Sequence, residues 1–158
     1  IAKELDFHTG SDYASCAESY SAKLLAVHLE IETLVDSVPP DSRQIVTNHD
    51  AFGYFANRYN FNIIGTVIPG GSTLAEPSAT DITNLISTIS KFSIPAIFVD
   101  ETSSEKIAQT VAKEAGESIK IVPLFSGSLG KPESGAETYE DMIRSNANRI
   151  VEALTSTR

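Results

Sequence analysis

The chain has 158 residues, of which 41% are hydrophobic and 21% charged, a composition that allows one domain with a buried core and argues against disorder. Its 12 Lys and Arg residues against 21 Asp and Glu residues give a net charge of −9 at pH 7, which disfavours nucleic acid and anionic membrane surfaces as partners. Cys16 is the only cysteine, so the chain can form neither an internal disulfide nor a zinc cluster built on thiolates.

Neither a membrane span nor a signal peptide is indicated by the sequence. A membrane-spanning helix requires a run of about 18 apolar residues, and no such run is present. The chain begins without an initiator Met, so we expect a processed or excised piece of a longer protein.

The first predicted element is a long helix. Apolar and aromatic residues recur at helical spacing between Ser11 and Val38, Ser11 or Asp12 can cap the start, and Pro39-Pro40 ends the pattern. A helix of about 27 residues would be about 40 Å long, which is unusual in a globular domain and suits a rigid connector. We interpret Cys16 as a small apolar residue on a buried helix face and His28 as a structural or surface residue.

Four short β-type runs follow, and each precedes a helical stretch. The runs cover residues 44–47, 62–68, 96–99 and 120–123, and the helical stretches cover residues 51–59, 79–92, 104–115 and 139–154. The segments 78–81, 102–105 and 138–141 have the form of a capping box, in which a hydroxyl and a carboxyl satisfy free N–H groups at a helix start. Strands that alternate with helices predict an α/β fold: a four-stranded parallel sheet with right-handed crossovers and helices on both faces.

Polar or glycine-rich residues follow every predicted strand. They are His49 after the first strand, Gly70-Gly71 after the second, Asp100-Glu101 after the third and Ser126-Gly127-Ser128 after the fourth. In an open parallel sheet, ligands bind outside the carboxyl ends of the strands. The two long loops, 69–77 and 124–137, fall at the same edge, which we therefore predict to be the functional one.

Residue spacing alone leaves the chemistry of this edge open. Neither phosphate-binding pattern, G-x-x-x-x-G-K-[ST] or G-x-G-x-x-G, is present, so Gly70-Gly71 more simply serve a turn. Ser126 or Ser128 could form a Ser-His-Asp arrangement with His49 and Asp100, but no G-x-S-x-G elbow follows a strand. His49 could also be an ordinary polar residue at a strand end.

Four separate motifs resemble one known family. They are "TNHDAFGYFANRY", "GTVIPGGSTLAEPSATD", "IPAIFVDETSS" and "SGSLGKPESGAETYEDMIRSNANRIVEAL". In this order and with these gaps they closely resemble the C-terminal lobe of the substrate-binding proteins of bacterial zinc and manganese ABC importers, from about Asp12 to Leu154. The resemblance implies one lobe of a bilobal metal-receptor fold. Residues 11–38 would form the long inter-lobe helix, residues 41–158 the C-terminal α/β lobe, and residues 1–10 the tail of a missing N-terminal lobe.

The resemblance also implies a metal site between the two lobes. Two ligands, usually histidines, come from the N-terminal lobe, and the third comes from the position of His49, which is His in zinc-type members and often Glu in manganese-type ones. A fourth is often an Asp in a segment like T-D-S-L, which here reads Ser126-Gly127-Ser128-Leu129, and Gly127 cannot ligate through a side chain. Water, Asp100 or a group from the missing lobe are the alternatives for that ligand.

His49 is therefore the predicted metal ligand of this chain. Asp50 is expected to cap the following helix, and Glu76 to organise its loop rather than to bind metal.

The function implied by the resemblance is that of half an extracytoplasmic metal receptor and not of an enzyme. It would capture a divalent metal, zinc in preference to manganese, as a transported ligand and deliver it to an ABC permease. The location would be periplasmic or at the cell surface, with a lipid anchor in the missing N-terminus as one arrangement. A metal-independent adhesion or interaction domain on the same scaffold and a small α/β hydrolase are the alternatives.

Overall fold

The computed structural model describes residues 1–70, 76–102, 104–116 and 118–156. Its centre is a four-stranded parallel sheet with the strand order β2-β1-β3-β4. The strands are β1 (Gln44–Thr47), β2 (Asn62–Thr66), β3 (Ala96–Asp100) and β4 (Lys120–Leu124). Both neighbours of β1, and the pair β3–β4, run parallel, which confirms the predicted sheet.

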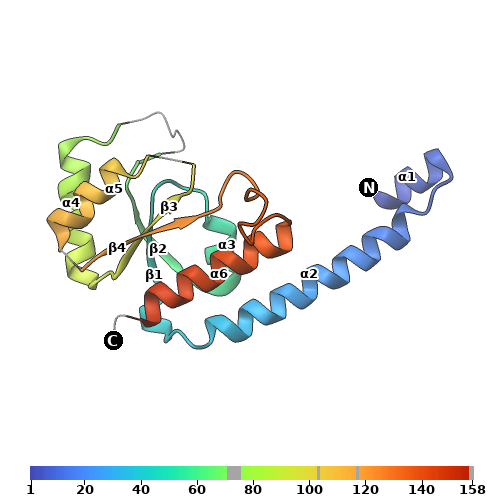
Figure 1. Ribbon diagram of the computed structural model, residues 1–158, viewed down its shortest axis with the longest axis horizontal. Helices are drawn as coiled ribbons and strands as arrows, with labels where there is room; N and C mark the ends of the chain where they lie inside the picture. Colours follow the sequence, from blue (N-terminus) through green and yellow to red (C-terminus); the bar gives the residue numbers. More distant parts are fainter. Residues whose placement is uncertain (71–75, 103, 117, 157–158) are drawn as a thin grey trace.

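Helices cover both faces of the sheet (Figure 1). Along the chain they are α1 (Ala2–Thr9), α2 (Tyr13–Val35), the 3₁₀ turn η1 (Pro40–Ser42), α3 (Gly53–Tyr59), α4 (Ala79–Phe92), α5 (Lys106–Ala115) and α6 (Tyr139–Thr155). One core lies between the sheet and α2, α3 and α6, and the other lies between the sheet and α4 and α5.

The alternation of side chains along β1 and β3 explains the two cores. Ile45 and Phe98 face the core of α2, α3 and α6, whereas Val46, Ile97 and Val99 face the core of α4 and α5. All five are at most 1% exposed. Successive residues of a strand point to opposite faces, so a strand that is buried on both faces is apolar throughout.

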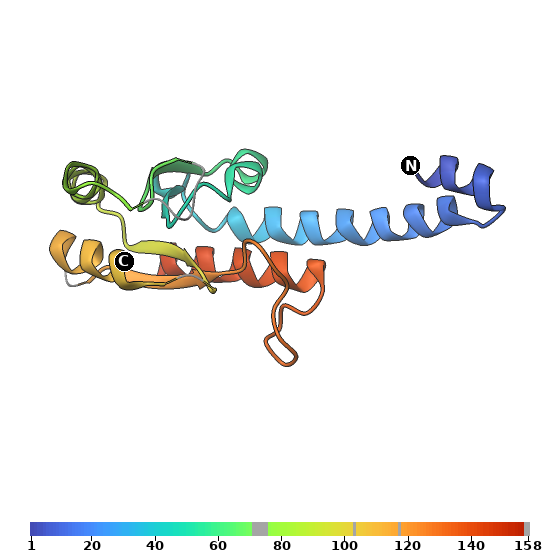
Figure 2. The ribbon, with the colours of Figure 1, turned by 90° about the horizontal axis from the view of Figure 1, so that it is seen from above.

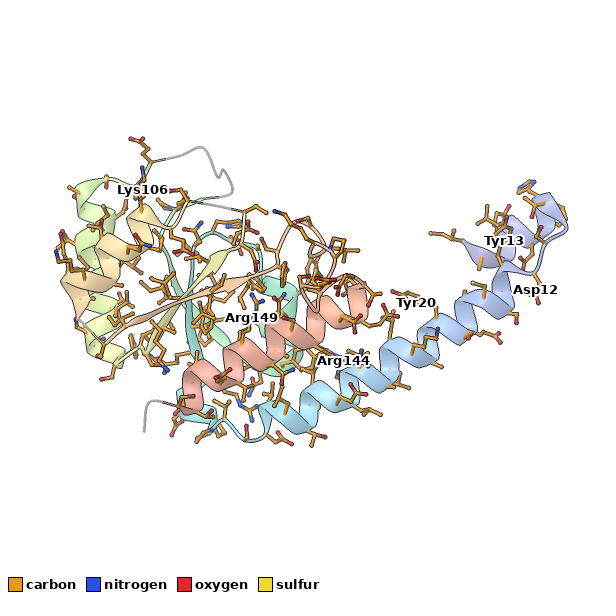
Figure 3. The ribbon with its side chains drawn as sticks, viewed as in Figure 1. Asp12, Tyr13, Tyr20, Lys106, Arg144 and Arg149 are labelled. Atoms are coloured by element: carbon orange, nitrogen blue, oxygen red, sulfur yellow. The ribbon has the colours of Figure 1, made fainter. Side chains whose placement is uncertain are left out.

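The long helix α2 packs on the sheet only through its last third. Its buried residues are Val27, Ile31 and Val35, spaced by one helical turn, and they lie in the core shared with α6. Arg144 of α6 also points to α2, where its Nε lies 2.7 Å from Glu30 Oε2 (Figure 3). The 23 residues of α2 make a helix about 34 Å long, so most of it runs out beyond the sheet, with α1 at its far end (Figure 2).

The two ends of α2 are fixed by side chains that bind the helix termini. At the start, Asp12 Oδ1 accepts a hydrogen bond from the backbone N–H of Ser15 at 3.0 Å, as predicted. At the end, the Arg43 guanidinium donates to the carbonyls of Val35 and Val38 at 3.1 and 3.0 Å. The helix stops at Val35, three residues before the predicted end, because the chain turns there and the fully buried Val38 enters the core.

Other features near the N-terminus differ from the predictions. Residues 1–10 contain a helix, α1, that has no buried residue and no sequence prediction of its own. Cys16 is exposed rather than buried, because it lies between Tyr13 and Tyr20, on the part of α2 that extends beyond the sheet (Figure 3). None of the helices in the described ranges, α2 included, is long and apolar enough to cross a membrane.

Two of the three predicted capping boxes do lie at the start of a helix. Ser78 and Asp81 form the reciprocal pair at α4, and the Thr138 hydroxyl accepts from the N–H of Asp141 at 3.2 Å in α6. The prediction for α5 is wrong: the helix begins at Lys106, and Glu105 at its N-cap makes no side-chain capping bond. The Thr102 hydroxyl binds the Asp100 carboxylate instead.

Candidate metal site

The backbone around His49 is held between neighbouring strands. The N–H of Asn48 donates to the carbonyl of Phe98 at 2.7 Å, and the carbonyl of Asn48 accepts from Ile68 at 2.8 Å. The Thr47 hydroxyl donates to the carbonyl of His49 itself at 3.0 Å. The backbone from which the His49 imidazole extends is therefore held in place by the sheet.

The imidazole of His49 lacks a partner on its buried side. Its Nδ1 atom is buried and makes no hydrogen bond with the residues that the structure describes. A buried polar atom without a partner is costly, and such atoms are rare unless an ion, a water or a functional ligand completes them. Neutral imidazole nitrogen is a good donor for zinc and related metals, so His49 suits a ligand at this edge.

Asp100 is the second polar group at the edge. It ends β3, is 7% exposed, and accepts hydrogen bonds from the N–H of Thr102 at 2.8 Å and from the hydroxyls of Thr102 and Ser126. Burial raises the pKa of Asp100, but the hydrogen bonds from Ser126 and Thr102, with a smaller contribution from His49, outweigh burial and lower it. Asp100 therefore carries a negative charge at neutral pH near His49.

Ser126 does not complete a Ser-His-Asp relay. In such a relay the serine hydroxyl gives its proton to histidine, which the carboxylate orients from the other side. Here the Ser126 hydroxyl donates directly to Asp100, and none of the hydrogen bonds described for Ser126 joins it to His49. The geometry thus favours a structural bond between the ends of β3 and β4 over a nucleophile.

The loop after β4 leaves open space where the resemblance places a carboxylate. Gly127 is exposed, and a Cβ atom built on it would meet no heavy atom within 4 Å. Within the described ranges, no group of three or more His, Cys, Asp or Glu residues is arranged to hold a metal ion. This part of the chain supplies His49 and the nearby charge of Asp100, but not a full ligand set.

The other residues singled out from the sequence show no feature of a metal ligand in the described part of the structure. Gly70 has φ 82°, in keeping with the predicted turn, whereas Gly71 lies outside the described residues. Glu76 is exposed. Asp50 does not cap α3 as predicted: the helix begins at Gly53, and its N-cap is Phe52, which makes no side-chain capping bond.

Two residues that shape the edge were missed by sequence reasoning. Asn146, 2% exposed on α6, donates to the carbonyl of Phe125 at 2.7 Å and accepts from its N–H at 2.9 Å. Arg149 donates to the carbonyl of Pro123 at 2.7 Å and to Glu101 at 3.0 Å. The sequence offered one indication that Asn146 is buried: it lies among the apolar residues of the buried face of α6.

The family profile described as "ZnuA: Zinc-uptake complex component A periplasmic" matches residues 2–153. The chain belongs to this family. Among its relatives, the manganese-binding lipoprotein MntA of Bacillus subtilis is 38% identical over 121 residues, which cover 74% of this chain and 39% of that protein. The zinc-binding protein TroA of Treponema pallidum is 32% identical over 141 residues, which cover 87% of this chain and 45% of that protein.

Solved structures agree with the sequence relatives. The periplasmic zinc-binding protein TroA from Treponema pallidum superposes with a TM-score of 0.85 at 29% identity, covering 97% of this chain and 57% of that one. The chain thus spans less than half the length of these two curated relatives and has the fold of one part of a bilobal receptor. The predicted family and fold are confirmed. The family contains metal-binding receptors of ABC importers named for zinc and for manganese, which are periplasmic proteins or lipoproteins.

Proposed function

We propose that this chain is half of an extracytoplasmic receptor that captures zinc and delivers it to an ABC permease. Residues 1–10 would belong to the end of an N-terminal lobe, residues 11–38 would connect the lobes, and residues 41–158 would form the C-terminal lobe. The observation that carries the proposal is the imidazole of His49, held at the carboxyl edge of the sheet with its buried Nδ1 unpartnered among the described residues.

The edge of the sheet supports metal capture through position and charge. His49 presents a ligand nitrogen from an anchored backbone, so little conformational freedom is lost on binding. The carboxylate of Asp100 adds negative charge beside it, and the net charge of −9 favours cations over the whole surface. The remaining ligands would come from the N-terminal lobe.

Contacts of α2, the proposed connector between the lobes, join it to the segment that follows His49. The His28 imidazole on α2 lies between α3 and Glu32: its Nδ1 is 3.3 Å from the Tyr59 hydroxyl, and its Nε2 is 3.2 Å from Glu32 Oε1. Because α3 begins four residues after His49, these contacts fix α2 relative to the site. A lobe attached through α2 would therefore meet His49 in a defined orientation.

The donor set favours zinc over manganese. Manganese prefers hard oxygen ligands, whereas nitrogen ligands increase the affinity for zinc. The site has His49 at the position that is often Glu in manganese-type receptors, and Gly127 offers no carboxylate. A protonated imidazole cannot bind a metal, so we also expect zinc affinity to fall as the pH drops below about 6.

Calorimetric zinc titration of this 158-residue chain and of the full-length protein tests the half-site. Tetrahedral zinc sites normally use three or four protein ligands, so the chain alone should bind weakly and the full-length protein much more tightly. Circular dichroism of the chain alone serves as the control that its fold is intact. Equal, tight affinity in both would show that a complete site lies within these residues and would overturn the proposal.

A further inference from the structure

The guanidinium of Arg149 lies at the carboxyl ends of β3 and β4, which is also the edge of the candidate metal site. Arg149 extends from α6 toward the sheet (Figure 3). Its Nη1 atom donates to the carbonyl of Pro123 at 2.7 Å and to Glu101 Oε2 at 3.0 Å. One amino group therefore binds both the end of β4 and the first residue after β3.

Contacts other than Glu101 already fix this guanidinium. Its Cζ atom lies 4.9 Å from the centroid of the Phe125 ring, a distance typical of cation–π attraction. The ring is held in turn, because Asn146 binds the N–H and the carbonyl of Phe125 at 2.9 and 2.7 Å. The Pro123 carbonyl belongs to β4. The fold thus places the charge of Arg149 whether or not Glu101 binds it.

The side chain of Glu101 is the member of the ion pair that can move. It is 43% exposed, against 30% for Arg149, and among the described residues Arg149 is the group that binds its carboxylate. The backbone is fixed, because the N–H of Glu101 donates to the carbonyl of Leu124 at 2.9 Å. If the guanidinium were lost, the carboxylate would be free to turn while the backbone stayed in place.

A free Glu101 carboxylate would add an oxygen donor beside His49. Thr47 of β1 pairs with Phe98 of β3. The residues two positions further on, His49 and Asp100, therefore leave the sheet side by side, and neighbouring strands are about 4.8 Å apart. Glu101 comes directly after this pair. Carboxylate oxygen is the hard donor that manganese prefers, and a metal held by His49 has places for further ligands.

We propose that Arg149 is a specificity-determining residue of the metal site. It binds the carboxylate of Glu101 and keeps this oxygen donor away from the metal at His49, which preserves the preference for zinc over manganese. Arg149 acts through Glu101 and does not touch the metal itself. The inference rests on the proposed function in metal capture.

Competition titration of zinc against manganese, on the full-length wild-type protein and its Arg149→Gln variant, tests this role. The new glutamine can still donate to the carbonyl of Pro123 but has no charge with which to hold Glu101. We expect the manganese affinity relative to zinc to rise about two- to fivefold, as for the release of an exposed ion pair. Loss of a positive charge favours both divalent ions, so the ratio of the two affinities is the readout.

A double variant separates the proposed role from a merely structural one. Arg149→Gln combined with Glu101→Gln should return the ratio to that of the wild type, because no carboxylate is left to release. A structural defect would persist, since the second change adds no contact. Arg149→Lys keeps the charge beside Glu101 and should shift the ratio less than Arg149→Gln. An unchanged ratio in Arg149→Gln, or a shift that persists in the double variant, would overturn the proposal.

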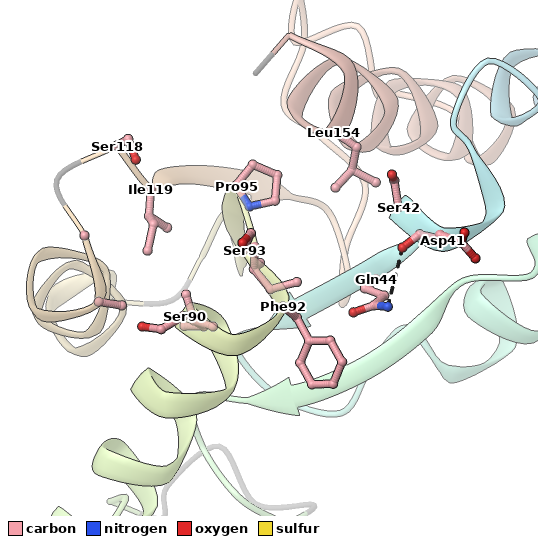
Figure 4. A pocket seen from close by; sticks show the side chains of 14 residues that line it. Asp41, Ser42, Gln44, Ser90, Phe92, Ser93, Pro95, Ser118, Ile119 and Leu154 are labelled. Atoms are coloured by element: carbon pink, nitrogen blue, oxygen red, sulfur yellow. Dashed lines mark hydrogen bonds between the residues drawn. The ribbon is translucent and has the colours of Figure 1, made fainter. Parts of the chain in front are cut away.

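Two controls lie away from this ion pair and should leave the ratio unchanged. Arg144→Gln breaks the ion pair with Glu30 on the same helix, where Nε lies 2.7 Å from Oε2. Ser118→Ala lies in the lining of a cavity of about 670 Å³ at the opposite edge of the sheet, where the strands begin (Figure 4).

Thermal unfolding of each variant shows whether its fold is kept. Phe125→Leu removes the ring on which the guanidinium lies, and should shift the ratio in the same direction to a smaller extent. It takes the place of Arg149→Gln if that variant does not fold, and an unchanged ratio would then overturn the proposal. A wild-type protein that binds neither metal would overturn the proposed function itself, whereas metal binding with an unchanged ratio overturns only the role of Arg149.

Discussion

The Ser126 hydroxyl donates a hydrogen bond to the carboxylate of Asp100, which joins the loop after β4 to the last residue of β3. The same carboxylate accepts from the N–H of Thr102 at 2.8 Å. Two of the four strand ends at the candidate metal site are thus held by one ionised side chain. Because His49 follows the neighbouring strand β1, the carboxylate also contributes charge next to the proposed ligand.

Replacing Ser126 by Ala should raise the pKa of Asp100, because the hydroxyl stabilises the ionised form. The folded pKa is lowered below its ordinary value of 3.8, so the stabilisation is present above that value and is lost as the pH falls through the folded pKa. We expect the variant to lose about 1.5–3 kcal/mol of unfolding free energy at neutral pH. The loss should shrink as the pH falls below about 3.8 and through the folded pKa of Asp100, which lies lower in the wild type than in the variant.

Urea unfolding between pH 3 and pH 7, together with an NMR titration of the Asp100 carboxyl, measures both effects. Ser118→Ala, which removes a hydroxyl at the other edge of the sheet, is the control and should leave the titration unchanged. A stability difference that does not vary with pH would mean that the bond does not favour the ionised carboxylate.

Replacing Asn146 by Ala should destabilise the fold by about 2–4 kcal/mol, because the N–H and the carbonyl of Phe125 both lose their buried partner. Asn148→Ala is the matched control: Asn148 is exposed on the same helix, and its change should cost less than about 0.5 kcal/mol. Chemical unfolding of the two variants gives the comparison. Equal effects would show that Asn146 does not hold the loop after β4.

Most elements could be predicted from the sequence because their signals are local. The run 44–47, in which three of four residues are β-branched, is β1 as predicted, and the capping box at Ser78 marks the start of α4. The strand order β2-β1-β3-β4 had no such signal, because it depends on the direction of each crossover and not on the residues within a strand. The helix α1 was also missed, because its apolar residues, such as Leu5 and Phe7, do not form a buried face.

The location of the candidate metal site could be predicted from the sequence, but the hydrogen bonds around it could not. The position of His49 at a strand end follows from the strand pattern, whereas its role as a ligand rests on the resemblance to metal receptors and stays a prediction. Thr102 has a hydroxyl that can bind either a helix N–H or a carboxylate two residues earlier, and the sequence does not show which. The structure has the second arrangement, with Asp100.

Replacing Gly127 by Asp should shift the metal preference of the full-length protein toward manganese. A Cβ atom at position 127 would meet no heavy atom within 4 Å, so there is room for the new side chain. At Gly65, by contrast, a Cβ atom would lie 2.6 Å from Leu85 Cδ1. The added carboxylate is a hard oxygen donor, so the manganese affinity relative to zinc should rise by about tenfold or more. Competition titration with both metals measures this ratio.

Gly127→Asn is the matched control for that change, because it has the same size without the charge and should shift the ratio much less. An unchanged ratio in Gly127→Asp would show that a carboxylate at this position does not reach the metal.

Zinc titration of full-length wild-type protein and of its His49→Ala variant, with manganese as competitor, tests the proposed metal site most directly. We predict that the wild type prefers zinc and that the variant binds zinc at least about tenfold more weakly. Even the loss of a residue that only hydrogen-bonds to a metal ligand typically changes metal affinity 10–100-fold. His8→Ala, on α1 at the far end of α2, is the control and should bind zinc as wild type does. A His49→Ala variant that binds zinc as tightly as wild type would contradict the role of His49 as a metal ligand.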